Sequence, residues 1–295
     1  PAIDRAVIDA IPDLPGVYLF HGEAGAPLYV GKSINMRTRV LSHFSDDVRS
    51  SREAQMAREV RTIETIRTCG ELGALLKEAE LVKTLLPVFN RQLRRVSGLS
   101  TFVFEPDKAP GEALRLAGGE EIESGSLAYM HGLFRTKRAA VAALRELADE
   151  HGLCLQTLGY EKAQRKGACF RHQVAKCAGL CAGKETLLAH HARVSAALAR
   201  LKVLAWPYRG PIGLVEQDAE RDATDIHVVD NWCYFGTART DEELASMLES
   251  PPRGRFDVDQ YKILVKFVAG KSRMKIVELP AFGLRETMDT LCTAS

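Results

Sequence analysis

The sequence lacks several features that would place the chain in a familiar class. No apolar run approaches the roughly 18 residues of a membrane span, and no N-terminal pattern of basic and then apolar residues indicates export. Seven cysteines in 295 residues are too few for a secreted disulfide scaffold. Repeats are absent, and residues 127–295 show no zinc-finger or helix-turn-helix pattern. We therefore expect a globular cytoplasmic protein that does not bind a membrane.

A strong net charge is also lacking, because 40 Lys and Arg nearly balance 38 Asp and Glu. The basic residues are unevenly placed, however. Residues 29–95 hold thirteen Lys or Arg against eight Asp or Glu, and residues 160–184 hold six against one. Two basic segments on a nearly neutral chain favour a polyanion that binds at defined places, although two solvated surfaces account for them equally well.

The length allows more than one domain, and the element pattern predicts an α+β fold. We expect a small three-stranded antiparallel sheet flanked by helices, then a helical segment rich in cysteine, then a smaller mixed α/β region. Pro87 should end a long helix that begins near residue 71. The predicted divisions are a first domain at 1–97, a linker at 98–126, the cysteine-containing segment at 127–205 and the mixed region at 206–295.

An acidic residue interrupts the apolar face of the helix predicted at 71–86. The apolar side chains of this segment fill an arc of about 180° on a helical wheel, and Glu78 lies inside that arc. A carboxylate that faces a core costs several kcal/mol unless a partner compensates it. Two partners fit: a Lys or Arg in a salt bridge, or Mg²⁺, which accepts one or two carboxylates and keeps most of its waters.

Tyrosines and basic residues precede this helix. The stretch GVYLFHGEAGAPLYVGKS is predicted to form two strands around a turn, with Tyr18 and Tyr29 on the strands and Lys32 directly after them. Arg39 and His43 follow on one face of a short helix. Near a metal-binding carboxylate, such groups suit phosphodiester cleavage, in which a cation stabilises charge on the phosphate and a base activates water. A tyrosine would need a depressed pKa to be that base at pH 7.

These residues together resemble a known nuclease domain. The tripeptides GVY and YVG, with Arg39, Glu78 and the LPVFN segment that ends in Asn90, have the order and spacing of the GIY-YIG nuclease family. The resemblance covers roughly residues 12–95. The resemblance is close to the N-terminal half of the excision-repair nuclease UvrC, and closer still to the shorter UvrC homologue Cho.

The resemblance implies a role for each residue. Glu78 would be the one protein ligand of Mg²⁺ or Mn²⁺, and Arg39 would stabilise charge on the phosphate. Tyr18 or Tyr29 would deprotonate or position the attacking water. The other expected catalytic residues are Lys32, which would assist, His43, at a position where the family often has His or Tyr, and Asn90, which would hold the site together through hydrogen bonds.

Four of the seven cysteines crowd into 28 residues, with the spacing Cys154-x14-Cys169-x7-Cys177-x3-Cys181. In a reducing compartment such a group favours a metal over disulfides. The irregular spacing suits an iron–sulfur cluster better than zinc, which usually has paired C-x2–4-C knuckles. Zinc, with His172 as a possible ligand, and free thiols are the alternatives. A similar KCAGLC-containing segment in UvrC implies a 4Fe–4S cluster.

Basic residues near both sites are expected to contact DNA phosphates without reading the sequence, and a solvated basic surface is the alternative. The expected DNA-binding residues are Lys32, Arg37, Arg91, Arg94, Arg95, Lys166, Arg171 and Lys176. In contrast, His190 and His191 are predicted to lie on the solvated face of an amphipathic helix.

The resemblance also implies a biological setting. The expected substrate is damaged double-stranded DNA, cut on the 3′ side of the lesion in nucleotide excision repair, with UvrB and UvrA as partners and a link to the SOS response. Nothing after residue 205 resembles the second nuclease or the helix-hairpin-helix tail of UvrC, which favours a Cho-like organisation with one active site. The start at Pro1 leaves an upstream exonuclease domain open. The alternatives are a restriction or mobile-element GIY-YIG nuclease, or a cluster-bearing DNA-binding adaptor without nuclease activity.

Overall fold

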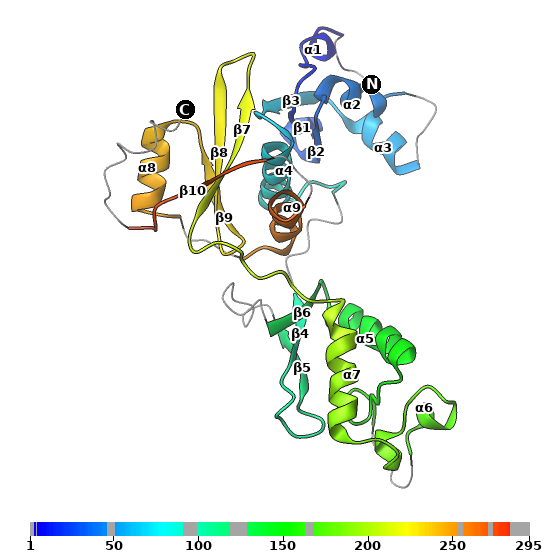
Figure 1. Cartoon of the computed structure of the whole chain (residues 1–295). Coiled ribbons are helices and arrows are strands. Elements are labelled where there is room, and N and C mark those ends of the chain that lie inside the picture. The colour runs from blue at the N-terminus through cyan, green and yellow to red at the C-terminus, as the bar shows by residue number, and fades with distance from the viewer. Residues whose placement is uncertain are drawn as a thin grey trace. The chain divides into compact units, whose positions relative to one another are not determined.

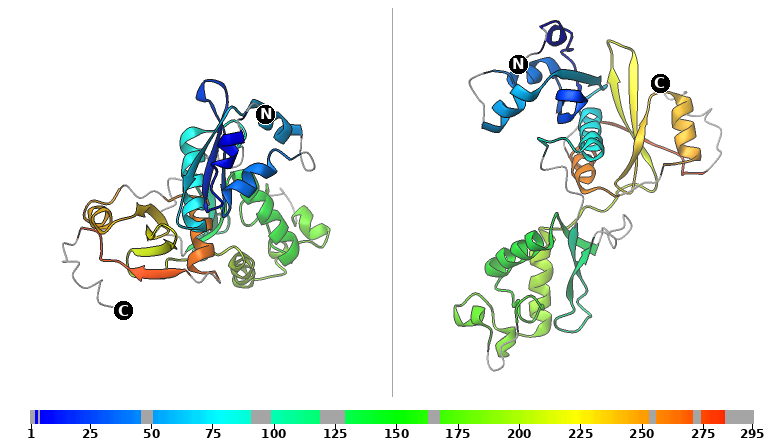
Figure 2. Two further views of the ribbon diagram at one scale, coloured as in Figure 1. Left: turned by 90° about the horizontal axis from the view of Figure 1, so that it is seen from above. Right: turned by 180° about the vertical axis from the view of Figure 1, so that it is seen from behind.

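The chain divides into two compact units, one formed by residues 1–95 and 206–295 and the other by residues 96–205 (Figures 1 and 2). The first unit is therefore discontinuous in sequence. The computed structural model describes residues 3, 5–45, 51–90, 99–118, 129–162, 168–252, 256–270 and 274–283. Within these ranges, none of the helices combines the length and the apolar character that crossing a membrane requires.

The N-terminal half of the first unit is a small antiparallel sheet with the strand order β2-β1-β3, flanked by helices (Figure 1). A short 3-10 turn joins the first two strands. This arrangement confirms the predicted fold class. The elements are α1 (Arg5–Asp9), β1 (Gly16–His21), β2 (Pro27–Ser33), α2 (Met36–Ser42), α3 (Ser51–Glu59), β3 (Thr62–Arg67) and α4 (Glu71–Leu85).

The central strand β1 has a core on each of its faces because successive side chains of a strand point in opposite directions. Tyr18 and Phe20 belong to the core that includes residues of α2 and α3, whereas Val17 and Leu19 belong to the core that includes residues of α4. Helix α2 starts where the Asn35 side chain accepts a hydrogen bond from the Thr38 N–H, which is a normal N-cap. The hairpin thus has a helix packed on each face.

The C-terminal half of the first unit is a four-stranded antiparallel sheet with the order β10-β7-β8-β9 and two helices, which confirms the mixed α/β region. Its elements are β7 (Ile212–Asp218), β8 (Ala223–Asp230), β9 (Cys233–Ala238), α8 (Asp241–Glu249), α9 (Val258–Val268) and β10 (Lys275–Glu278). Helix α4 contacts β1 and β2 as well as α9. Both views in Figure 2 show α4 and α9 side by side, so the two halves share this helix.

The second unit packs helices against a three-stranded sheet with the order β5-β4-β6. Strands β4 and β5 lie within residues 98–126, which the sequence predicted to be a linker. These strands are part of the folded second unit, because Phe102 and Leu114 are buried in one core with Leu144 and Leu198 of the helices. The elements are β4 (Ser100–Phe104), β5 (Leu114–Gly118), β6 (Met130–Phe134), α5 (Lys137–His151), α6 (Phe170–Gln173), a 3-10 turn at Leu180–Ala182 and α7 (Leu187–Ala199).

Candidate active site

The hairpin brings its two tyrosines together beside a glycine. Tyr18 on β1 lies opposite Gly31 on β2, and the two tyrosine ring centroids are 6.1 Å apart. A Cβ on Gly31 would lie 2.4 Å from Tyr18 Cζ and 2.7 Å from Tyr29 Cε1. Any larger residue would displace one of the rings. The glycine of the YVG tripeptide is therefore needed for the close approach of both phenols.

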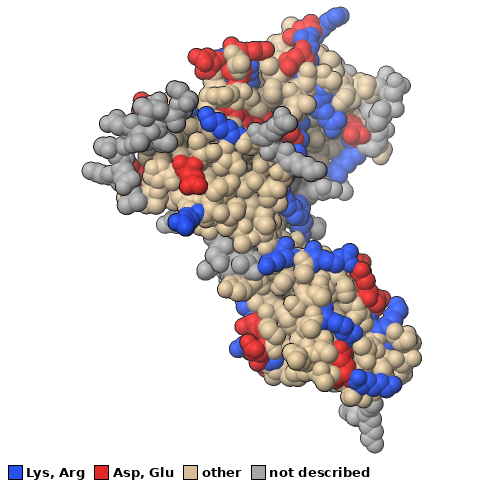
Figure 3. Space-filling model, in the orientation of Figure 1, with Lys and Arg blue, Asp and Glu red and all other residues tan. Residues whose placement is uncertain are grey.

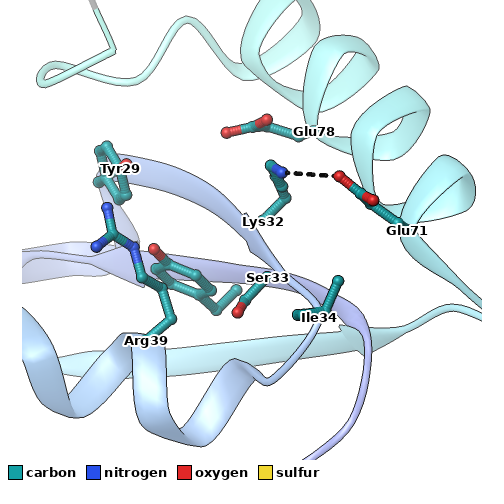
Figure 4. Close-up of a pocket in the computed structure, with 8 residues that line it drawn as sticks. Tyr29, Lys32, Ser33, Ile34, Arg39, Glu71 and Glu78 are labelled. Carbon is teal, nitrogen blue, oxygen red and sulfur yellow. Dashed lines mark ion pairs between the residues drawn. The ribbon is translucent and has the colours of Figure 1, made fainter. Parts of the chain in front are cut away.

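These phenols face a pocket of about 430 Å³ between the hairpin and helices α2 and α4 (Figure 4). Lys32 and Ser33 come from the end of β2, Arg39 comes from α2, and Glu71 and Glu78 come from α4. The lining residues are Tyr18, Tyr29, Lys32, Ser33, Ile34, Arg39, Glu71 and Glu78. The fold thus brings five of the seven predicted catalytic residues to one pocket.

Glu78 is half-buried, and burial raises the pKa of its carboxyl to about 7 against the lowering effect of Lys32 and Arg39. Among the residues that the structure describes, it has no ion-pair partner. The Lys32 ammonium is instead 3.6 Å from Glu71, which lies seven residues, about two turns, before Glu78 on the same face of α4 (Figure 4). A carboxylate that has no ion pair among the described residues, in a pocket with room for waters, is a donor that fits a hard divalent cation.

The Tyr18 hydroxyl is 2.8 Å from Nε2 of His43, and both side chains are buried. Burial lowers the pKa of His43 to about 4, with Arg39 adding to the shift, so the ring is neutral at pH 7. Burial also raises the pKa of both Tyr18 and Tyr29. The direction is opposite to the depression that a phenolate base at pH 7 would need.

Asn90 connects the end of the predicted domain to β2. Its side-chain oxygen accepts from the Val30 N–H at 2.9 Å, and its amide nitrogen donates to the Val30 carbonyl at 2.7 Å. Val30 lies between Tyr29 and Gly31 in sequence, so this pair of hydrogen bonds holds the strand that carries the tyrosine. Asn90 itself is not among the residues that line the pocket.

The predicted DNA-binding residues are mostly paired or fall outside the described residues. Arg37 is 3.0 Å from Asp9, and both Arg171 and Lys176 pair with Asp149. On the face shown in Figure 3, Lys and Arg side chains gather along one edge of the second unit, and acidic side chains lie among the basic ones over the rest of it. Four of the predicted residues lie outside the described residues: Arg91, Arg94, Arg95 and Lys166.

The four clustered cysteines converge in the second unit, where their sulfur atoms all lie within 4.8 Å of one another. Cys154, Cys169 and Cys177 are buried. The N–H of Gly179 donates to the Cys177 sulfur at 3.4 Å, and the hydroxyl of Thr157 donates to the Cys154 sulfur at 3.1 Å. Four thiols held so closely fit a metal centre.

Two histidines in this region differ from the sequence-based expectation. His172 is not a member of the cysteine group, because its Nδ1 is 2.9 Å from the Cys177 carbonyl. His190 and His191, predicted on a solvated face, are both buried. The Nε2 of His190 accepts from the Cys154 N–H at 3.0 Å, whereas its Nδ1 is buried without a partner among the described residues.

Sequence reasoning missed three residues that contact α4 or its pocket. Glu71 lines the pocket, and its position seven residues before Glu78 on the same helix was an available signal. Glu216 and Lys266 come from the C-terminal half of the unit and contact the first turn of α4. No sequence pattern connects positions so far apart.

Profiles of three related domains match most of the chain. A UvrC-like GIY-YIG domain matches residues 14–91, a UvrC/Cho excinuclease middle domain matches residues 114–200, and an excinuclease Cho C-terminal domain matches residues 211–283.

Individual proteins agree with these profiles. The chain is 40% identical to excinuclease Cho from Salmonella typhi over 276 residues, which cover 93% of this chain and 89% of that protein. It is 41% identical to excinuclease Cho from Escherichia coli strain K12 over 263 residues, which cover 89% and 85% of the two chains.

Among solved structures, the N-terminal GIY-YIG endonuclease domain of UvrC from Thermotoga maritima, bound to its catalytic divalent cation magnesium, is 31% identical. It covers 29% of this chain and 93% of that one with a TM-score of 0.27, a value too low to carry a structural argument. The family is shown by the three profiles and by the long alignments at 40% and 41% identity. The chain belongs to the excinuclease Cho family of UvrC-related GIY-YIG nucleases, which act in nucleotide excision repair.

Proposed function

We propose that the chain hydrolyses one phosphodiester bond on the 3′ side of a DNA lesion in a reaction that depends on Mg²⁺ or Mn²⁺. The observation that carries the proposal is Glu78, a half-buried carboxylate without an ion-pair partner in the described part of the chain. It lines one pocket with Tyr29, Lys32 and Arg39. The 3′ position of the cut comes from the resemblance to the N-terminal half of UvrC.

Each pocket residue has a role that follows from its chemistry. Glu78 holds the divalent cation, which when bound activates water and stabilises negative charge on the phosphate. Arg39 is exposed on α2 and directs its guanidinium towards the pocket, where it stabilises charge on the phosphate oxygens (Figure 4). Lys32 adds a second positive charge, shared with Glu71.

The tyrosines position the attacking water. Burial raises the pKa of both phenols, which favours hydrogen bonding to the water over its deprotonation by a phenolate. The Tyr18 hydroxyl is held by its hydrogen bonds to the His43 ring and to Arg39, which fixes the phenol beside the pocket. Asn90 holds β2, and with it Tyr29, in place.

The four clustered cysteines, Cys154, Cys169, Cys177 and Cys181, would hold the metal centre in this proposal. The resemblance to UvrC favours a 4Fe–4S cluster, whereas the spacing of the sulfur atoms fits one zinc ion better. One zinc ion bound at about 2.3 Å by four sulfurs would keep them about 3.8 Å apart, which is within the observed limit. A cubane needs the sulfurs farther apart, because each binds a different iron. Metal analysis with an absorbance scan near 400 nm after anaerobic purification separates the two, and a colourless zinc-containing protein contradicts the cluster.

The substrate and partners complete the proposal. Damaged double-stranded DNA is the substrate, and UvrB, loaded with the help of UvrA, is the partner that brings the nuclease to the lesion. This part rests on the family, since Arg171 and Lys176 are paired within the chain. A cytoplasmic location and a link to the SOS response stay predictions.

One assay tests the function. A duplex with one defined lesion is incubated with Mg²⁺ or Mn²⁺, with and without UvrA and UvrB, and the cut is mapped to the nucleotide for the wild-type chain and Glu78→Gln. We expect one cut on the 3′ side that requires Glu78. Sequence-dependent cutting of undamaged DNA would support a nuclease outside repair, and no cutting under any condition would support an adaptor.

A further inference from the structure

Helix α4, which carries Glu78, has no capping side chain of its own. Gly70 precedes it, whereas an Asn, Asp, Ser or Thr at that position would accept from an N–H of the first turn. The carboxylate of Glu216 on β7 takes this place. Its Oε1 accepts from the Leu72 N–H and its Oε2 from the Gly73 N–H, each at 2.8 Å. Glu216 is therefore an N-cap supplied by the C-terminal sheet.

Two glycines make room for this contact. A Cβ on Gly70 would lie 2.3 Å from Oε1 of Glu216, and a Cβ on Gly73 would lie 3.3 Å from Oε2 and 3.2 Å from the His227 ring. A side chain at Gly70 would therefore push the carboxylate off the helix end. The start of α4 thus has no capping side chain of its own, and its two glycines leave room for the carboxylate of Glu216.

The charge of Glu216 is buried and compensated within the protein. Besides two backbone N–H groups, it accepts from Nε2 of His227 at 3.1 Å, and it faces the positive end of the α4 dipole. His227 Nδ1 is 2.8 Å from the Thr237 hydroxyl, which is 2.6 Å from the Tyr234 hydroxyl. Since a carboxylate only accepts, Nε2 of His227 carries a proton and donates it to the hydrogen bond with Glu216. Burial raises the pKa of Tyr234 to about 12, so it stays a donor.

The C-terminal half also holds α4 at two other points. Near the far end of the helix, Lys83 pairs with Asp257 at the start of α9. On the pocket side, Lys266 of α9 is 3.3 Å from Glu71, which in turn pairs with Lys32. The helix that carries the pocket's two acids is therefore held at both ends by residues from after position 206.

We propose that Glu216, oriented by His227, is a positioning residue of the nuclease site: by capping α4 it fixes the place of Glu78 and thereby the affinity for the divalent cation. A helix rises 1.5 Å per residue, so Glu78 lies about 8 Å from the capped N–H groups along the axis. The inference rests on the metal-binding role proposed for Glu78. It makes the C-terminal sheet part of the nuclease site.

The test compares Mn²⁺ binding by full-length chains, measured by calorimetry and by electron paramagnetic resonance. Glu216→Gln keeps the size of the side chain and replaces one acceptor oxygen by a donor, so at least one N–H of α4 loses its partner. The matched control is Asp218→Asn, on the same strand, because Asp218 pairs with Arg67 of β3 at 2.7 Å and with Arg221, and not with a described residue of α4. The part of the Mn²⁺ binding signal that Glu78→Gln removes is the part that comes from the pocket.

We expect Glu216→Gln to raise the Mn²⁺ dissociation constant about 10-fold, the usual size for loss of a supporting contact, and Asp218→Asn to leave it unchanged. The Mn²⁺ concentration that gives half-maximal incision should rise by the same factor, whereas a merely structural loss would lower only the maximal rate. If Glu216→Gln does not fold, His227→Gln keeps the carboxylate and should raise the constant a few-fold.

Two results would overturn the inference, and only one of them would also overturn the metal-binding role of Glu78. Wild-type Mn²⁺ affinity in the Glu216 and His227 variants, with binding lost in Glu78→Gln, would remove the positioning role and leave the proposed function intact. Wild-type affinity in Glu78→Gln would remove the metal-binding role of Glu78, and the positioning role with it.

Discussion

In the nuclease pocket Glu78 has no ion-pair partner among the described residues, whereas the four clustered thiols lie against one another and accept nearby N–H and O–H donors. The cysteine site also comes from 28 residues of one connection, while the pocket helix takes its cap from a residue 144 positions away. The pocket keeps its reactive groups available and depends on a distant support. The cysteine site is local and satisfies its own polar groups.

The largest expected effect is on catalysis and comes from the pocket. Glu78→Gln removes the charge that we propose binds the metal, and we expect incision of a lesion-containing duplex to fall on the order of 10³-fold. The melting temperature should not fall, because burial disfavours the charged carboxylate and costs the uncharged amide less. Incision rates and a thermal melt check both parts. A large drop in melting temperature would mean that Glu78 is a structural residue.

A substitution in the cysteine site should lower stability and leave the pocket unchanged. Cys177→Ser should lose bound metal and lower the free energy of unfolding of the second unit by several kcal/mol, since metal binding to such a site is folding energy. The Mn²⁺ affinity of the pocket should stay unchanged.

Metal analysis, calorimetry and the Mn²⁺ titration make this measurement, and Cys233→Ser, a buried cysteine outside the group, is the control. Loss of metal from the control variant would show that the site is not the one described.

A third change acts on the pocket through packing alone. Gly31→Ala adds a methyl group 2.4 Å from the Tyr18 ring, so we expect about a 100-fold loss of incision from displaced phenols. The control is Gly118→Ala in strand β5, where nothing lies within 4 Å of the added carbon. Single-turnover incision of both variants checks the comparison, and equal rates would contradict the role of the glycine.

The smallest effect is on pH dependence. The pKa of His43 is about 4 in the folded chain and near 6.5 when unfolded, so the unfolded state binds more protons between these values. The free energy of unfolding should therefore fall as the pH falls, by about 2 kcal/mol from this group between pH 7 and pH 5.

In His43→Gln, which cannot titrate, this part of the decrease should be absent. Denaturant titrations of both proteins at several pH values measure the difference. Parallel pH curves for the two proteins would show that another group is responsible.

The parts of the site that follow from local pattern could be predicted from the sequence. The alternation of β1, the turn and the helical spacing around Glu78 predicted the hairpin and α4, because period and burial are local properties. Tertiary pairing could not be predicted in this way. Arg171 and Lys176 looked like DNA contacts because nothing in the sequence indicates that Asp149 lies beside them.

Burial of polar residues was also missed where a distant partner allows it. His190 is buried because a backbone N–H 36 positions earlier donates to it, and such a donor leaves no mark on the helical pattern. The Gly- and Ser-rich stretch around β4 and β5 was predicted to be a linker because its few apolar residues become a core only against the helices of the second unit.

The cap on α4 has a consequence for synthesis of the chain on the ribosome. All of the pocket side chains come before residue 91. The carboxylate that caps the first turn of α4 belongs to Glu216, which is translated 144 residues after Leu72. A nascent or prematurely terminated polypeptide therefore carries every nuclease group with the first turn of the helix unfinished. The order of translation thus delays completion of the proposed nuclease site until the chain through Glu216 has been made.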